Sequence, residues 1–192
     1  MTSVVFDLDG TLLDSDEALV RPFVELGVPR SQITFGHVLE AECHRLGISV
    51  ADYLERYDPE RAEPFPGVED ILRSLDRWAV CSNKHPRSGW AELDRLGWQP
   101  DVARFSDAFE GSKRLGPVLD ALGVVAADVV YVGDTDHDRR CARDVGATFV
   151  LAAWNDRAEP GPGDIVAARP GDVLEVVATL DGGRGTQESG RR

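Results

Sequence analysis

VVFDLDGTL, at residues 4–12, runs from an apolar strand through two acids into a Gly-Thr turn. Asp7 and Asp9 stand two residues apart, and because the chain leaves the strand at Asp7, the turn can direct both carboxylates into one pocket above the strand's end. Two like charges held close together are costly unless a cation neutralises them or one acid keeps its proton. The pair therefore predicts a hard-metal site, or a nucleophile beside a general acid. In the alternative interpretation, Asp-Gly marks a turn and Asp7 only caps it.

Two other apolar strands also end in polar side chains. WAVC at 78–81 precedes Ser-Asn-Lys at 82–84, and VVYV at 129–132 precedes GDTDHD at 133–138. In an open parallel sheet, ligands bind at the carboxyl ends of the strands, beside helix N-termini that favour anions. Helical segments and further apolar runs alternate along the chain, which predicts a Rossmann-like parallel sheet of the α/β class. The helices are expected at 68–75, 85–96, 118–122 and 139–145, and the further strands at 148–152 and 164–168.

Residues 15–64 interrupt this alternation. Their apolar side chains recur at helical spacing, which predicts a small all-helical cap inserted after the first strand. The α/β core is then expected at 1–14 and 65–180. Residues 181–192 are rich in glycine and polar side chains and have little to bury, so the sequence predicts a disordered tail there.

Composition excludes several classes of function. The 192 residues carry a net charge of −13 and are 42% hydrophobic, so an acidic surface would repel nucleic acid and anionic membranes. No apolar run approaches the length of a membrane span, and the chain starts directly with a core strand, so we expect a cytoplasmic protein. Cys43, Cys81 and Cys141 lack metal-site or disulfide spacing and are expected to be buried. The sequence does not indicate an oligomeric state.

Lysine is unusually rare in this chain. Of the 21 basic residues only Lys84 and Lys113 are lysines. A lysine retained among arginines indicates a place where a compact ammonium fits and a wide guanidinium does not. Chance is the alternative, because codon bias leaves a few lysines anywhere.

The polar strand ends resemble the motifs of the haloacid dehalogenase-like hydrolase superfamily, in its phosphoglycolate phosphatase-like branch. Four blocks occur in the family's order within residues 3–152: DLDGTL at 7–12, CSNK at 81–84, Lys113, and GDTDHD at 133–138. The first and last blocks are specific, whereas a serine after a strand and a single lysine are weak alone. The cap resembles the family in position and helical character only.

The resemblance implies an acidic metal centre. Asp7 would be the nucleophile and form an aspartyl-phosphate. Mg²⁺ would be held by Asp7, the backbone carbonyl of Asp9 and Asp134, and Asp138 would support these ligands from outside the set that contacts the metal. The Asp9 side chain would protonate the leaving alcohol and then activate water.

The resemblance also implies a phosphate-binding set. Ser82 and Asn83, with nearby backbone N–H groups, would hold the transferring phosphoryl group. Lys113 would neutralise that group and orient Asp7.

Other residues near these blocks keep simpler interpretations. Asp136 is expected to cap a helix or face water, His85 and His137 to cap or be solvated, and Lys84 either to contact substrate or to be solvated. The tryptophans are expected in the core or at the cap interface, and they are Trp78, Trp90, Trp98 and Trp154.

Two departures from the family pattern limit what can be transferred. Arg114 follows Lys113 where this branch often has proline, which puts the local backbone path in doubt, and the cap is small. Because the cap supplies most substrate contacts, phosphoglycolate hydrolysis does not follow from the resemblance.

The expected function is therefore a Mg²⁺-dependent phosphatase acting on a small phosphorylated metabolite. A phosphosugar mutase of the same superfamily is the main alternative, since it would keep Asp9. A dehalogenase would not need an acid two residues after the nucleophile. A non-enzymatic binding module would not need the set Asp7, Asp9, Lys113 and Asp134.

Overall fold

A six-stranded parallel sheet forms the centre of the computed structural model, which describes residues 1–188. The strand order is β5-β4-β1-β6-β7-β8, and neighbouring strands pair in parallel. The strands are β1 (Ser3–Phe6), β4 (Trp78–Cys81), β5 (Val102–Arg104), β6 (Val129–Gly133), β7 (Thr148–Ala152) and β8 (Ile165–Ala167). The central strands β1, β4 and β6 are buried throughout, as expected of a sheet covered on both faces.

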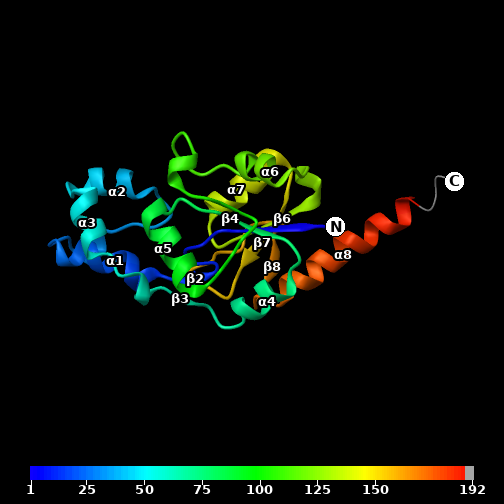
Figure 1. The fold of residues 1–192 in the computed structure, drawn as a ribbon, viewed down its shortest axis with the longest axis horizontal. Helices are drawn as coiled ribbons and strands as arrows, with labels where there is room; N and C mark the ends of the chain where they lie inside the picture. Colours follow the sequence, from blue (N-terminus) through cyan, green and yellow to red (C-terminus); the bar gives the residue numbers. More distant parts are fainter. Residues whose placement is uncertain (189–192) are drawn as a thin grey trace.

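Helices cover both faces of this sheet (Figure 1). One face packs against α6 (Gly116–Leu122) and α7 (Asp136–Val145). The other packs against α4 (Val68–Ser74), α5 (Pro86–Leu96) and α8 (Asp172–Glu188). Because side chains alternate along a strand, Val4 and Phe6 of β1 join the second layer and Val5 the first.

The cap is a separate group of helices at one end of the sheet (Figure 1). It contains α1 (Asp16–Glu25), α2 (Leu39–Leu46), α3 (Val50–Arg56) and the short 3₁₀ helices Arg30–Gln32 and Pro59–Arg61. It has its own apolar cluster around Phe23, Val28, Cys43 and Tyr53. The antiparallel pair β2 (Leu13–Asp14) and β3 (Glu63–Pro64) joins cap to core, so the outgoing and returning chains lie side by side. We propose the division into a cap at 15–64 and a core at 1–14 and 65–180 on this basis.

The predicted α/β class with a helical cap is confirmed, and the differences are local. Strand β5 was not predicted, because three residues are too few to show a period. Helix α7 begins at Asp136, three residues before the predicted start, because Thr135 and Asp138 form a capping box. Trp90 is 47% exposed and packs edge-on against Phe105, so the expectation of burial was wrong for this residue.

The end of the chain differs from the expected disordered tail as far as it is described. Helix α8 continues to Glu188, and Asp181 within it accepts hydrogen bonds from the backbone N–H and the hydroxyl of Thr2 at 2.9 and 2.8 Å. This contact joins α8 to the residue before the first strand, and apolar side chains of α8 pack against the core as well. Composition does not show these long-range interactions. Residues 189–192 lie outside the described residues. Within residues 1–188, no helix has both the length and the apolar character needed to cross a membrane.

Candidate active site

The candidate site lies where the strand order reverses. The chain passes from β1 to β4 and β5 on one side and then returns to β6 on the other side of β1. Such a reversal opens a crevice at the carboxyl ends of the two central strands, the usual place for a ligand in open α/β sheets. Asp7 directly follows β1 and Asp134 directly follows β6, so the predicted acids meet at this crevice.

A tight turn brings these two acids together. Gly10 has a φ of 76°, and a Cβ there would lie 2.4 Å from Oδ2 of Asp134, so only glycine fits. The Thr11 hydroxyl donates to Oδ1 of Asp134 at 3.4 Å, and Asn155 Nδ2 donates both to Oδ2 of Asp134 and to the Gly10 carbonyl at 2.9 Å. The Gly-Thr turn therefore fixes the position of Asp134 as well as reversing the chain.

Asp7, Asp134 and Asp138 form a buried acidic cluster. Each can offer one carboxylate oxygen so that the three atoms lie within 4.8 Å of one another. Burial raises the pKa of Asp7 to about 6, with Lys113 opposing the shift, and burial together with the neighbouring carboxylates raises the pKa of Asp134 to about 7. Carboxylates that resist ionisation in this way are stabilised by a hard divalent cation, and oxygen donors are what Mg²⁺ prefers. The donor set therefore fits the predicted ion.

Lys113 holds two of these acids. Its Nζ lies 2.7 Å from Oδ2 of Asp7 and 2.6 Å from Oδ1 of Asp138. Burial disfavours the Lys113 charge, but the two carboxylates outweigh it and raise the pKa of the lysine. The predicted contact between Lys113 and Asp7 is thus present in the geometry.

Asp138 is held from several sides. Oδ1 accepts from Tyr131 Oη at 2.8 Å, and Oδ2 accepts from the hydroxyl and backbone N–H of Thr135. Burial disfavours its charge, but Lys113 and these donors outweigh it and hold the pKa of Asp138 below its usual value. With both oxygens engaged, Asp138 anchors Lys113 and α7, which agrees with the supporting position predicted for it.

Asp9 faces a second buried lysine. Oδ1 of Asp9 accepts from Ser15 Oγ and from Lys84 Nζ, both at 2.6 Å. The same ammonium lies 2.9 Å from Oε1 of Glu92 and donates to Tyr57 Oη at 2.9 Å. Lys84 is therefore buried among partners, and the expectation that it might be solvated was wrong.

Glu92 is a buried acid with an incomplete set of partners. Oε1 contacts Tyr57 and Lys84, but among the described residues no hydrogen-bond partner reaches Oε2. Burial raises the pKa of Glu92 to about 7, with Lys84 opposing the shift. Tyr57 follows α3 of the cap and Glu92 lies in α5 of the core, so this cluster spans the boundary between them.

Ser82 and Asn83 follow β4 and line the same cavity as Asp7. Ser82 is buried, and its Oγ accepts from the Lys84 backbone N–H at 3.3 Å. The Asn83 side chain is engaged at both ends, because Nδ2 donates to the Gly36 carbonyl at 2.9 Å and Oδ1 accepts from the Lys113 backbone N–H at 2.6 Å. The Asn83 side chain therefore connects the cap to the backbone of Lys113, and both of its polar atoms are engaged without a phosphate.

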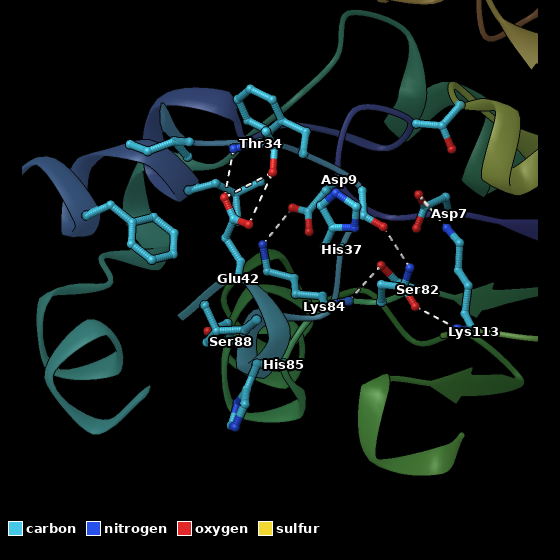
Figure 2. A pocket seen from close by; sticks show the side chains of 18 of the residues that line it. Asp7, Asp9, Thr34, His37, Glu42, Ser82, Lys84, His85, Ser88 and Lys113 are labelled. Carbon is cyan, nitrogen blue, oxygen red and sulfur yellow. Dashed lines mark hydrogen bonds and ion pairs between the residues drawn. The ribbon is translucent and has the colours of Figure 1, made fainter. Parts of the chain in front are cut away.

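Several residues around the site were not predicted from the sequence. Asn155 and Arg157 follow β7 at the same sheet edge, so the strand-end rule that found Asp134 would have found them too. Glu92 and Tyr57 carry no local signal, because their meeting depends on how the cap docks. His37 comes from the loop before α2 and lines the cavity (Figure 2).

The simpler interpretations hold for two polar residues. Asp136 is exposed and pairs with Arg139 at 2.6 Å and Arg140 at 3.0 Å. His85 caps α5, since its Nδ1 accepts from the Arg87 backbone N–H at 3.2 Å.

Side chains of the core and the cap line a partly open cavity of about 90 Å³. Asp7, Ser82 and Lys113 lie at one end of it, Thr34 and Glu42 lie at the other, and Asp9, His37 and Lys84 lie between them (Figure 2). The volume holds several water molecules and therefore suits a small ligand.

Comparisons with known proteins agree with this arrangement. The model of the family described as haloacid dehalogenase-like hydrolase matches residues 4–152. A phosphoglycolate phosphatase of Xanthomonas campestris pv. campestris is 30% identical over 215 residues, covering 92% of this chain and 96% of the relative. Pyrophosphatase PpaX of Halalkalibacterium halodurans is 24% identical, covering 92% and 97%. The structure of a haloacid dehalogenase-like family hydrolase from Streptococcus pneumoniae superposes with a TM-score of 0.72 at 23% identity, covering 92% of this chain and 98% of that one.

Proposed function

The chain belongs to the haloacid dehalogenase-like hydrolase family, and we propose that it is a Mg²⁺-dependent phosphatase that hydrolyses a small cytoplasmic phosphomonoester through an aspartyl-phosphate on Asp7. The observation that carries the proposal is Lys113 Nζ, 2.7 Å from Oδ2 of Asp7 in a buried acidic crevice at the end of the sheet. Relatives whose names describe phosphatases support the same class of reaction.

The metal would be held by the side chains of Asp7 and Asp134 and by the backbone carbonyl of Asp9. When bound, Mg²⁺ would neutralise charge on the phosphoryl oxygens, so that a carboxylate can approach a dianion. Asn155 and Thr11 keep Asp134 aimed at this place in the geometry described above. Asp138 stays with Lys113 and takes no place among the ligands we propose.

Asp7 is oriented for attack on phosphorus. Oδ1 accepts from the Leu8 backbone N–H at 2.7 Å and Oδ2 from Lys113, so the carboxylate cannot rotate freely. One Asp7 oxygen forms the new P–O bond while the bond from phosphorus to the ester oxygen breaks, and Asp9 gives its proton to the departing alcohol. Asp9 then takes a proton from water, whose oxygen attacks phosphorus and releases inorganic phosphate and free Asp7. Lys113 and Ser82 stabilise the phosphoryl oxygens in both steps.

Asp9 weighs against the alternatives to different degrees. A dehalogenase has no alcohol leaving group to protonate, so it would not need Asp9 as a general acid. A phosphosugar mutase would use Asp9 in the same way, and product analysis separates it from a phosphatase.

The decisive experiment is a screen of phosphorylated metabolites in which released phosphate and any isomerised sugar phosphate are both measured. We expect phosphate release that requires Mg²⁺ and stops after chelation. In the Asp7→Asn variant we expect less than a few per cent of wild-type turnover with the fold retained, because an amide is not a competent nucleophile. Full activity after exhaustive chelation, or substantial turnover by the verified variant, would contradict the mechanism.

A further inference from the structure

The half of the cavity away from Asp7 differs in character from the phosphoryl end. We propose that it accepts an uncharged, largely apolar leaving group and discriminates against a carboxylate such as that of glycolate. The proposal rests on the proposed phosphatase function and names the substrate class of that site. It also departs from the substrates in the names of the relatives, since glycolate and phosphate are both anionic leaving groups.

The cap contributes apolar and aromatic side chains to the cavity lining. They are Leu19, Phe23, Ile33, Phe35, Leu39 and Tyr53. A leaving group that enters among these side chains loses contact with water. Apolar groups gain free energy from that transfer, whereas a carboxylate loses its hydration and needs a new partner.

The polar groups of the cap in this region are already engaged. Tyr53 Oη donates to the Leu19 carbonyl at 2.9 Å, and Tyr57 Oη belongs to the cluster of Lys84 and Glu92. The carboxylate of Glu42 accepts from the Thr34 backbone N–H at 2.8 Å and from Arg45 Nε at 2.8 Å. Figure 2 shows Glu42 and Thr34 turned toward each other at the end of the cavity. A second carboxylate at this end would have to compete with Glu42 for Thr34 and Arg45.

The cations that line the cavity are likewise neutralised. Lys113 lies between Asp7 and Asp138, and Lys84 lies between Asp9 and Glu92. Arg157 pairs with Asp16 at 2.6 Å, and its guanidinium stacks 4.4 Å from the centroid of the Phe35 ring. A carboxylate on the leaving group would have to take a cation from one of these pairs and leave a carboxylate behind.

Two histidines and a serine add further polar groups to the lining. They are His37, His85 and Ser88. An imidazole or a hydroxyl can donate to a hydroxyl or an amide as well as to a carboxylate, so these groups can serve a neutral hydrogen-bonding substituent. The leaving group that fits is therefore apolar with room for a neutral hydrogen-bonding group.

The test compares phosphate esters of primary alcohols, so that the leaving oxygen stays alike. The probes are 2-phosphoglycolate, its neutral amide, n-butyl phosphate and benzyl phosphate, assayed with Mg²⁺. We expect kcat/KM for the butyl and benzyl esters to exceed that for phosphoglycolate by at least about tenfold, with the amide between them. Calorimetric binding of the same esters to the Asp7→Asn variant separates recognition from chemistry, and we expect the same order.

A charge placed in the cap reverses the preference if the proposal is right. Leu39→Arg adds a cation that lines the cavity, and Leu46→Arg adds the same cation to the same helix outside it. We expect Leu39→Arg to raise the ratio of kcat/KM for phosphoglycolate over benzyl phosphate at least about tenfold, and Leu46→Arg to leave it unchanged. Thermal unfolding of both variants checks that the cap is intact.

The outcomes distinguish this inference from the proposed function. Equal or better turnover of phosphoglycolate by the wild-type protein overturns the apolar leaving group and leaves the phosphatase in place. Failure to hydrolyse any of the phosphate esters, in the presence of Mg²⁺ and across the metabolite screen, overturns both.

Discussion

The only two lysines of the chain occupy equivalent positions in two different clusters. Each ammonium is buried and bridges two carboxylates: Lys113 joins Asp7 to Asp138, and Lys84 joins Asp9 to Glu92. The Lys113 cluster is built from the core alone and its acid Asp138 has donors on both oxygens. The Lys84 cluster takes Tyr57 from the cap side and leaves Oε2 of Glu92 without a hydrogen-bond partner among the described residues.

The two clusters therefore differ in how far their geometry depends on the cap. The acids of the Lys113 cluster are held by turns and caps next to β1 and β6, so their geometry is set when the sheet forms. The Lys84 cluster is complete only when the cap rests on α5. Asp9 belongs to the second cluster, so the proposed acid–base group depends on cap docking whereas the proposed nucleophile does not.

Exchanging Lys113 for arginine tests the tighter cluster, and we expect the largest effect there. A guanidinium is wider and planar, so it cannot occupy the point between Asp7, Asp138 and a phosphoryl oxygen without displacing one of them. We expect kcat of Lys113→Arg to fall about 10²- to 10³-fold, the usual cost of losing a stabilising donor at a transition state.

The matched control for this substitution is a cation on the open surface. Arg56→Lys reverses the exchange on an exposed helix end and should be nearly silent in the same assay. If Lys113→Arg turned over at close to the wild-type rate, Lys113 would be a generic cation and the proposed role would fail.

Removing Asp134 should separate metal binding from the lysine clusters. Asp134 supplies one of few protein oxygens in the acidic cluster, and water replaces a missing carboxylate poorly. Because the loss of an outer partner alone costs up to about 100-fold in affinity, we expect Asp134→Ala to weaken Mg²⁺ binding by at least that factor, measured by calorimetry. Unchanged affinity in this variant would place the metal elsewhere.

The strand-end acids are the part of the site that sequence reasoning can reach. Asp7 and Asp134 follow apolar strands, and the rule that ligands bind at the carboxyl ends of a parallel sheet brings them together without coordinates. Lys113 was predicted from the order of blocks and from the scarcity of lysine, and its ammonium lies 2.7 Å from Oδ2 of Asp7. The fold class and the position of the cap could be predicted because helices and strands place their apolar residues at different periods, which shows over long segments.

The cap-dependent part could not be predicted, for a physical reason. Tyr57 and Glu92 are 35 residues apart, and their meeting depends on how two separately packed apolar clusters dock. The contact of Asn83 with the cap could not be predicted either, because its partner Gly36 lies in a cap loop without a motif. Strand β5 is too short to have a period, and α8 is placed by long-range contacts, among them core packing and the contact of Asp181 with Thr2.

Lys84→Met tests the looser cluster and should have a smaller effect on catalysis. The substitution leaves the Asp9 and Glu92 carboxylates without their shared cation, so Asp9 is held less firmly, by Ser15 without the lysine. We expect kcat to fall about tenfold with KM little changed, because positioning is only part of what acid–base catalysis contributes.

A second substitution separates positioning from folding in this variant. Unpaired buried carboxylates also destabilise the fold, and the double variant Lys84→Met with Glu92→Gln should recover much of the stability without recovering kcat. Recovery of kcat along with stability would mean that Lys84 acts on the fold alone. A loss of kcat as large as that of Lys113→Arg would remove the contrast between the clusters.

The pH dependence of stability gives the smallest effect and resolves the two clusters separately. In the metal-free protein the pKa values of Asp7 and Asp134 are raised to about 6 and 7, and that of Glu92 to about 7, mainly by burial. Between about pH 4 and 7 the folded state therefore binds more protons than the unfolded chain, so the free energy of unfolding falls as the pH rises, by at most about 1.4 kcal/mol per pH unit for each group. Denaturant unfolding from pH 5 to 8 should show this decline. Asp134→Asn should remove the share of Asp134 and leave that of Asp7, and Glu92→Gln should remove the share of the Lys84 cluster. Saturating Mg²⁺ should oppose the decline only where Asp134 is present, because the ion binds the folded, ionised acids. A metal-free stability that instead rises from pH 5 to 8 would contradict the charge assignment in both clusters.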